Sequence, residues 1–333
     1  MKKISREQVL KDYNKLKIVA RKYTQKNDYE KALRTIFVAA GFMYTYSQIY
    51  FDDELEQLIK IIGDDLCLNI SIRGDRPKKI MFYDGFGNDR RGLALIYLRA
   101  LKKLGYGIVY VTYQEFSGTI DEISKLLDEH EIIYLQEKSV VKQIHELNNI
   151  INYNNICQVL LYMCPDDVVA TTVFSQYKGV IERYLINLTD HAFWLGKEAF
   201  DYCIEFRSYG GNLSYQERKI EHDKIFCLPF YPNIACEEFQ GFPFEGKNKK
   251  IVFSGGALYK TKGMDNLYYK MVEQIIQMDE DVIFYYAGEG DCSEIDKLIK
   301  KYPQKVYYSH ERKDFYEVMK RCYVYLSTYP YFG

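Results

Sequence analysis

The segment 252–263 carries the residues best suited to hold a diphosphate. An apolar run ends there in Ser254, Gly255 and Gly256, and the same loop continues to Lys260, Lys262 and Gly263. Glycine lets a backbone approach a ligand closely, and loop N–H groups beside lysine ammonium groups bind phosphate oxygens. A Walker A loop is excluded, because no glycine-lysine pair in the chain is followed by serine or threonine. The alternative is an ordinary lysine-rich surface loop.

Two later segments also follow apolar runs and carry polar residues. Gly288 and Glu289 lie in the first, and His310 and Arg312 lie in the second. Each segment alone is a common turn. The carboxyl ends of parallel strands meet at one edge of a sheet, however, and ligands bind at that edge. We therefore expect these residues to join the glycine and lysine loop at one ligand site.

Asp190 and His191 form a second candidate centre, which we expect to be catalytic. They follow an apolar run and precede Trp194, the only tryptophan of the chain. Imidazole titrates near neutral pH, so a histidine at a strand end can position a hydroxyl group or accept a proton. The alternative is a purely structural histidine.

A glycine-containing turn follows the apolar run at 80–83 and includes Gly85, Gly87 and Asn88. It precedes a predicted helix, whose first N–H groups could face an anion or a hydroxyl group. The glycine spacing does not fit the Gly-x-Gly-x-x-Gly dinucleotide fingerprint, which argues against a nicotinamide or flavin cofactor. A tight turn that needs glycine for its geometry is the alternative interpretation.

The elements that must position these residues alternate between apolar runs and amphipathic stretches, which is typical of parallel β-α-β units. Strands are predicted at 80–83, 107–112, 132–135, 158–163, 184–188, 202–206, 225–230, 250–254, 282–287, 305–308 and 323–327. Helices are predicted between most of them, for example at 93–104, 140–150 and 293–301. Residues 5–65 also have apolar positions at helical spacing and predict helices before the first strand.

This pattern predicts an α/β fold with two Rossmann-like, doubly wound domains. We expect a helical extension at 1–76, a first domain at 77–232, a linker at 233–248 and an incomplete second domain at 249–333. The linker is predicted from a stretch rich in proline, glycine, glutamate and lysine.

Composition argues against several classes of protein. The 333 residues carry a formal net charge of −1, so the basic excess that is typical of nucleic-acid binders is missing. Eight cysteines are scattered without a Cys-x-x-Cys pair, which argues against a zinc site or a dense disulfide framework. Residues 1–21 alternate charged and apolar residues without the continuous apolar core of a signal peptide, and no run of about 18 apolar residues follows. We expect a cytoplasmic protein.

The order of motifs in the second half resembles the donor half of GT-B glycosyltransferases, particularly family 4 and its relatives. The resemblance rests on the Gly-Gly turn followed by Lys-Gly, on Ala-Gly-Glu-Gly-Asp, on His-Glu-Arg-Lys-Asp and on the apolar run that ends at Ser327. It covers residue 249 to the end, with a looser match over 78–232. It implies a nucleotide-sugar domain at 249–333 and an acceptor domain at 77–232.

The resemblance also implies roles for individual residues. Lys262, and with it Lys260, would contact the donor diphosphate, which Gly255 and Gly256 would approach through their backbone. Residues 310–313, with His310 and Arg312, would line the nucleotide base, and Gly263, Gly288 and Glu289 would complete the donor site. His191 would lie near the transferred sugar, and the turn with Gly85, Gly87 and Asn88 would face the acceptor.

The expected function is metal-independent transfer of a hexose-type sugar from a UDP or GDP donor to a glycan, lipid-linked or protein acceptor, in polysaccharide biosynthesis and without a further cofactor. Family members continue beyond the strand at 323–327, so we expect a truncated donor domain. Truncation favours an alternative, a catalytically silent partner of another glycosyltransferase. Nucleotide-sugar epimerisation is a third alternative. The resemblance allows a location at the inner face of the membrane as well as in the cytoplasm.

Overall fold

The computed structural model describes residues 5–73, 78–89, 92–229, 231 and 237–331. The chain divides into two compact parts, Met1–Asn233 and Ile234–Gly333, which we call the N-terminal unit and the C-terminal unit. The boundaries expected between 76 and 77 and between 232 and 233 lie outside the described residues.

Three helices begin the N-terminal unit, namely α1 (Arg6–Gln25), α2 (Tyr29–Tyr46) and α3 (Asp53–Asp65). Each follows a side chain that caps its first N–H groups, and these caps are Ser5, Asp28 and Asp52. Because their apolar residues recur at helical spacing, one stripe of each helix is buried. The helices predicted within 5–65 are therefore present.

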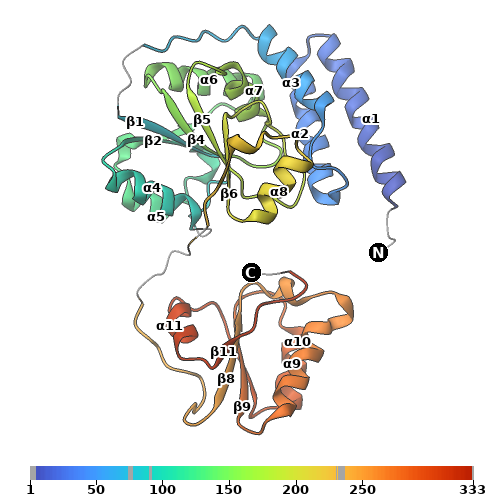
Figure 1. Ribbon diagram of the computed structural model, residues 1–333, viewed down its shortest axis with the longest axis vertical. Helices are drawn as coiled ribbons and strands as arrows, with labels where there is room; N and C mark the ends of the chain where they lie inside the picture. The colour runs from blue at the N-terminus through green and yellow to red at the C-terminus, as the bar shows by residue number, and fades with distance from the viewer. Residues whose placement is uncertain (1–4, 74–77, 90–91, 230, 232–236, 332–333) are drawn as a thin grey trace. The chain divides into compact units, whose positions relative to one another are not determined.

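A parallel sheet of seven strands follows, in the order β3-β2-β1-β4-β5-β6-β7 (Figure 1). The strands are β1 (Lys79–Asp84), β2 (Gly107–Tyr113), β3 (Ile132–Leu135), β4 (Gln158–Tyr162), β5 (Glu182–Ile186), β6 (Tyr202–Glu205) and β7 (Ile225–Cys227). In the register of the central strands, Phe82 lies opposite Tyr110 on one side and Leu160 on the other. The strand order reverses between β1 and β4, and ligands of open parallel sheets bind beyond the strand ends at such a switch point.

Helices cover both faces of this sheet (Figure 1). α4 (Leu93–Lys103) and α5 (Asp121–Leu126) pack on one face, and α6 (Val140–Tyr153) and α7 (Val168–Gln176) pack on the other. α7 is buried along most of its length, because α2 and α3 contact it as well as the sheet. α8 (Ser208–Gln216) connects β6 to β7. The layer of α1 to α3 thus shares one hydrophobic core with the sheet.

The C-terminal unit contains a parallel sheet of four strands in the order β10-β9-β8-β11. The strands are β8 (Lys250–Gly255), β9 (Val282–Ala287), β10 (Val306–Ser309) and β11 (Val324–Tyr325). α9 (Leu267–Met278) and α10 (Ser293–Lys301) cover one face of it. α11 (Phe315–Lys320) covers the other face together with Phe239, Phe242 and Phe244, so the described part of the expected linker packs on this unit. The switch point of this sheet lies between β8 and β11.

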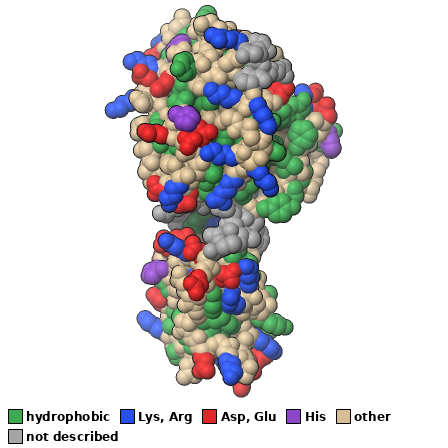
Figure 2. Space-filling view, turned by 90° about the vertical axis from the view of Figure 1, so that its left-hand side faces the viewer, with side chains coloured by type: hydrophobic (Ala, Val, Ile, Leu, Met, Phe, Trp, Pro, Cys, Tyr) green, Lys and Arg blue, Asp and Glu red, His purple; other side chains and the backbone are tan. Residues whose placement is uncertain are grey.

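Both units therefore alternate strands and helices around a parallel sheet, which confirms the predicted α/β fold with two Rossmann-like parts. Basic and acidic side chains intermingle over the surface seen in Figure 2, in keeping with the net charge of −1. Among the helices that the structure describes, none is both long and apolar enough to cross a membrane.

Candidate functional site

In the N-terminal unit, Asp190 and His191 lie in the loop that follows β5. Asp190 is only 4% exposed, whereas the His191 ring is largely exposed. Nδ1 of His191 lies 3.3 Å from a carboxylate oxygen of Asp190. Arg207, which follows β6, donates to both carboxylate oxygens at 2.6 and 2.9 Å. A buried carboxylate therefore holds an exposed imidazole and an exposed guanidinium at the carboxyl ends of β5 and β6.

The electrostatics of this cluster separate the roles of its members. Burial raises the pKa of Asp190, but hydrogen bonds from His191 and Arg207 outweigh it and lower the pKa to about 2. Asp190 is therefore ionised at neutral pH and orients its partners. A carboxylate acceptor favours the tautomer with a proton on Nδ1, which leaves Nε2 of His191 as the nitrogen that can accept a proton. Arg207 was not predicted, although its place just after a predicted strand is a signal of the same kind.

The turn after β1 is closed by its own hydrogen bonds. The N–H groups of Phe86 and Gly87 each donate to Asp84 at 2.9 Å, and the Gly85 N–H donates to the carbonyl of the last residue of β4 at 2.8 Å. Asn88, which is half-buried, follows them. The predicted turn lies at the switch point, but the amide groups of its first three residues are bonded within the protein.

A cavity of about 430 Å³ opens beside this turn. Its lining includes Gly85, Phe116, Cys164, Asp166 and Asp167, together with residues of α2 and α6. Burial raises the pKa of Asp167 to about 6, although hydrogen bonds from the Ala170 N–H and the Tyr83 hydroxyl oppose the change. Asp167 is the N-cap of α7. The cavity thus combines carboxyl groups with an aromatic wall near the switch point.

In the C-terminal unit, the turns after β8 and β9 touch through two glycines. A Cβ on Gly288 would lie 1.9 Å from the carbonyl oxygen of Gly256, so only glycine fits at position 288. Gly256 has a φ of +118°, and nothing that is described lies within 4 Å of the place of its missing Cβ. Gly255 is buried, and a Cβ there would lie 2.3 Å from the Phe315 ring. Open space therefore lies beside Gly256 at the carboxyl end of β8.

Two lysines follow this space along the chain. Lys262 forms an ion pair with Asp291, and both side chains are exposed, at 38% and 62%. The hydrogen bond from Lys262 lowers the pKa of Asp291 to about 2. Lys260 is half-buried and has no ion-pair partner within the described part of the chain. Gly263, with a φ of +123°, ends the loop.

The other predicted donor residues differ in their surroundings. Glu289 and His310 are exposed after β9 and β10. Arg312 is built into the fold, because it donates to both oxygens of Asp314, to the Gly241 carbonyl at 2.7 Å and to the Tyr285 hydroxyl at 3.1 Å. It fastens the segment before β8 to β9, and its contact with a nucleotide base stays a prediction.

Tyrosine hydroxyls tie these turns to neighbouring strands. Tyr286 on β9 donates to the Gly256 carbonyl at 2.9 Å, and Tyr308 on β10 donates to the Gly288 carbonyl at 2.7 Å. Each phenol satisfies a turn carbonyl on the adjacent strand. β9 thus holds the turn that follows β8, and β10 holds the turn that follows β9.

Comparison with known proteins identifies the fold. No protein-family model and no curated protein matches the sequence. A mutant of the Thermobaculum terrenum O-GlcNAc transferase matches 98% of this chain with a TM-score of 0.51 and 13% identity, and the chain spans 63% of the length of that protein. The UDP-GlcNAc 2-epimerase from Neisseria meningitidis, solved with UDP-GlcNAc, matches 75% of this chain and 77% of its own with a TM-score of 0.53 and 14% identity. These similarities and the two parallel sheets show that the chain has a GT-B glycosyltransferase-like fold.

Proposed function

We propose that this chain is a glycosyltransferase that moves a hexose-type sugar from a UDP or GDP donor to a glycan, lipid-linked or protein acceptor. The two similar structures carry names of nucleotide-sugar or sugar-transfer enzymes, which supports use of a nucleotide sugar. A shared fold does not select a reaction, so the assignment depends on the residues at the strand ends.

The observation that carries the proposal is the open space beside Gly256. It lies at the carboxyl end of a switch-point strand, where ligands of parallel sheets bind, and Lys260 and Lys262 follow it. A diphosphate there would replace Asp291 as the partner of Lys262, so one charge-assisted contact would be exchanged for another. Two ammonium groups would then stabilise the charge of the leaving diphosphate without a metal ion.

His191 would serve the acceptor. The acceptor hydroxyl oxygen attacks the anomeric carbon, and the bond between that carbon and the phosphate oxygen breaks. Nε2 of His191 takes the hydroxyl proton, and ionised Asp190 stabilises the resulting imidazolium. The geometry of the Asp190 and His191 pair supports this role.

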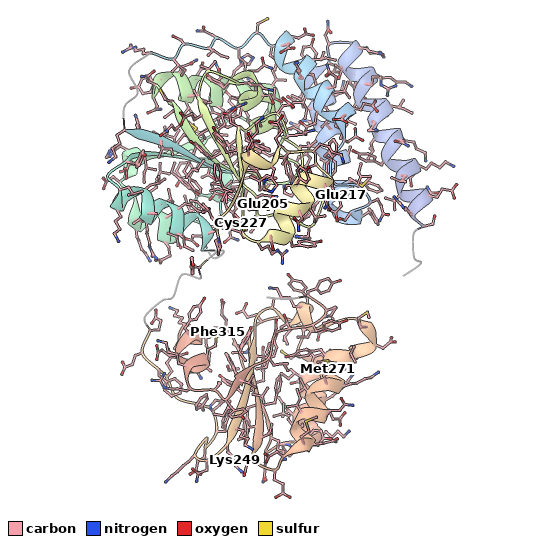
Figure 3. The ribbon with its side chains drawn as sticks, viewed as in Figure 1. Glu205, Glu217, Cys227, Lys249, Met271 and Phe315 are labelled. Atoms are coloured by element: carbon pink, nitrogen blue, oxygen red, sulfur yellow. The ribbon has the colours of Figure 1, made fainter. Side chains whose placement is uncertain are left out.

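Calorimetric titration of the chain with UDP and with GDP tests the donor site. We expect Lys262→Ala to weaken binding about tenfold, because one charge-assisted contact is lost. The matched control is Lys249→Ala, since Lys249 is 36% exposed and pairs with Asp281 at 2.7 Å. Lys249 lies at the amino end of β8, far along the strand from the glycine turn (Figure 3). Equal losses in both variants, or no binding of either nucleotide, would contradict the proposal.

Epimerisation of a nucleotide sugar is the second candidate, because one of the two similar structures is named as a UDP-GlcNAc 2-epimerase. Incubation with UDP-GlcNAc, followed by NMR of the products, separates the two reactions. A sugar with changed configuration, free or still bound to UDP, would indicate an epimerase, whereas released UDP together with unchanged GlcNAc would indicate a transferase that passes the sugar to water. Nucleotide binding with neither product would favour a catalytically silent partner.

A further inference from the structure

A buried arginine holds the loop that carries His191. Arg218 follows α8 and is fully buried. Its Nη2 lies within hydrogen-bond distance of the carbonyls of Thr189, Asp190 and Ala192, at 3.3, 3.0 and 2.7 Å. These carbonyls flank His191 on both sides. One guanidinium therefore fixes the path of the backbone through the histidine.

Two aromatic rings enclose this guanidinium. Its Cζ lies 5.1 Å from the ring centre of Tyr50 and 4.9 Å from that of Trp194. Trp194 belongs to the loop itself, whereas Tyr50 lies between α2 and α3. The layer of N-terminal helices thus supplies one wall of the arginine site.

The same layer holds the loop beyond Trp194. Glu56 on α3 accepts hydrogen bonds from the Gly196 N–H at 2.7 Å and the Lys197 N–H at 3.3 Å. The ammonium group of Lys197 lies 4.8 Å from the Phe51 ring. The segment 50–56 therefore supports the loop on both sides of the tryptophan.

A buried carboxylate completes the support. Glu205, at the end of β6 and beside α8 in Figure 3, accepts from the Asn187 side chain at 2.8 Å and from the Ser214 hydroxyl. The Asn187 oxygen accepts in turn from the Thr189 N–H at 3.1 Å, and the Ser214 oxygen accepts from Arg218 at 3.4 Å. Side chains from β6 and α8 thus fix the start of the loop as Arg218 fixes its middle.

We propose that Arg218 is a positioning residue for His191, and that the α1 to α3 layer completes the position through Tyr50 and Glu56. The proposal rests on the proposed role of His191. A buried cation whose hydrogen bonds go to neutral oxygens is costly to maintain, even with the carboxylates of Glu205 and Asp190 nearby, and an apolar side chain of similar length would fill the same space. Such a side chain would not bind the three carbonyls, so His191 would lose its fixed orientation toward Asp190.

The variant Arg218→Met tests this role, and Arg183→Met is the matched control. Arg183 is equally buried and donates to the Phe174 carbonyl at 2.6 Å and the Glu198 carbonyl at 3.0 Å, but it also pairs with Asp201 and lies near the start of β5. Losses that merely follow from removing a buried arginine would appear in both variants. Losses that arise from the loop would appear in Arg218→Met alone.

Two readouts need no enzymatic activity. Diethyl pyrocarbonate modifies exposed imidazoles, and mass spectrometry reports the rate at each histidine. We expect the rate at His191, relative to exposed His222 as the internal reference, to change at least threefold in Arg218→Met and to stay constant in Arg183→Met. Acrylamide quenching of Trp194, the only tryptophan, is expected to increase in Arg218→Met alone.

Kinetics supply the third readout. We expect kcat of Arg218→Met to fall about 100-fold with UDP affinity and KM for the donor unchanged, because displacement of a catalytic group by about 1 Å has this cost. Arg218→Lys should fall in between, since the lysine side chain is one atom shorter and its ammonium nitrogen does not extend to the position of Nη2. Should Arg218→Met not fold, Tyr50→Leu keeps the guanidinium, removes one wall and should change the same readouts in the same direction.

The outcomes separate the two proposals. Unchanged His191 modification and unchanged Trp194 quenching in folded Arg218→Met would overturn the positioning role, whatever the activity. Changed modification together with an unchanged kcat of an active enzyme would also overturn it, because His191 would then not need its position. A His191→Ala variant with full transfer activity would instead contradict the proposed function of the histidine.

Discussion

At the scale of single residues, Asp190 and His191 are adjacent in sequence but lie in different surroundings and have different proposed roles. The carboxylate is buried and ionised, and the adjacent imidazole is exposed. Sequence reasoning placed both at a strand end but could not distinguish their surroundings. Arg207, which follows the next strand of the sheet, donates to the carboxylate and helps to keep it ionised.

Asp190→Asn should separate orientation from charge. The amide oxygen can still accept a hydrogen bond from Nδ1, but it cannot stabilise an imidazolium or neutralise Arg207. We expect kcat to fall about 100-fold or more while UDP affinity changes less than about twofold. Steady-state kinetics and calorimetry measure both. Asp201→Asn, which breaks the ion pair with Arg183 at the other end of β5, controls for lost stability.

Asp291 should compete with the donor for Lys262. Asp291→Asn removes a negative charge from the proposed diphosphate site and frees the ammonium group. We therefore expect UDP to bind about two- to fivefold more tightly at low salt, and the gain to shrink at about 1 M salt because the pair is exposed. Weaker binding of UDP by Asp291→Asn would argue that Asp291 contacts the ligand favourably.

At the scale of elements, the contact between the turns after β8 and β9 makes a sharp prediction. Gly288→Ala would press a methyl group against the Gly256 carbonyl, so the two turns must move apart. We expect a loss of about 1 to 3 kcal/mol in the unfolding free energy of the C-terminal unit, together with weaker nucleotide binding. Gly118→Ala is the control, because nothing lies within 4 Å of a Cβ at that position. Urea titration monitored by circular dichroism measures the change.

The bond between α3 and the His191 loop predicts a pH dependence of stability. Burial raises the pKa of Glu56 from 4.5 to about 7, against the hydrogen bonds from Gly196 and Lys197. The folded protein therefore binds this proton more tightly than the unfolded chain. Its stabilising contribution is full below the unfolded pKa and is lost as the pH rises through about 7.

We expect the unfolding free energy of the wild type to fall relative to that of Glu56→Gln by up to about 3 kcal/mol between about pH 5 and about pH 8. Denaturation followed through Trp194 fluorescence checks this. Parallel curves for the two proteins would show that Glu56 does not titrate in this range.

Much of the element pattern was predictable, because burial of parallel strands leaves long apolar runs. β9 (Val282–Ala287) matches its predicted range, whereas β5 begins two residues earlier than predicted, at Glu182. Arg183 is charged and does not fit the apolar run from which the strand was predicted. Its charge is instead neutralised by Asp201, a partner on the far side of the loop that sequence periodicity does not reveal.

In the candidate site, only the residues that directly follow strand ends were predictable from the sequence. Lys262, Gly256 and His191 follow that rule. Arg218, Tyr50 and Glu56 do not, because their importance arises from packing between segments more than a hundred residues apart. The hydrogen bonds that fix Arg312 were not predictable for the same reason, since their acceptors, Gly241 and Tyr285, belong to other segments of the chain.

At the scale of the whole molecule, the two compact units predict two responses to nucleotide. The proposed diphosphate site lies within the C-terminal unit, and Trp194 lies within the N-terminal unit. UDP at about 100 times its Kd should stabilise the unit that binds it by about 2.7 kcal/mol. We expect calorimetry to show one thermal transition shifted by UDP and a second one, tracked by tryptophan fluorescence, that stays in place. A tryptophan transition that shifts equally would place nucleotide contacts in the N-terminal unit.

The hydroxyl groups of Tyr286 and Tyr308 determine what a substitution at either position would change. Replacing either by phenylalanine preserves nearly all of the buried volume, so the sheet would still assemble. Each missing hydroxyl would nevertheless remove a hydrogen bond to the turn that follows the adjacent strand. For Tyr308 on β10, the acceptor that loses its donor is the Gly288 carbonyl. The chain has 33 tyrosines, and replacing these two by phenylalanine would leave the interior filled. It would nevertheless remove the hydrogen bonds that hold the turns of the proposed diphosphate site.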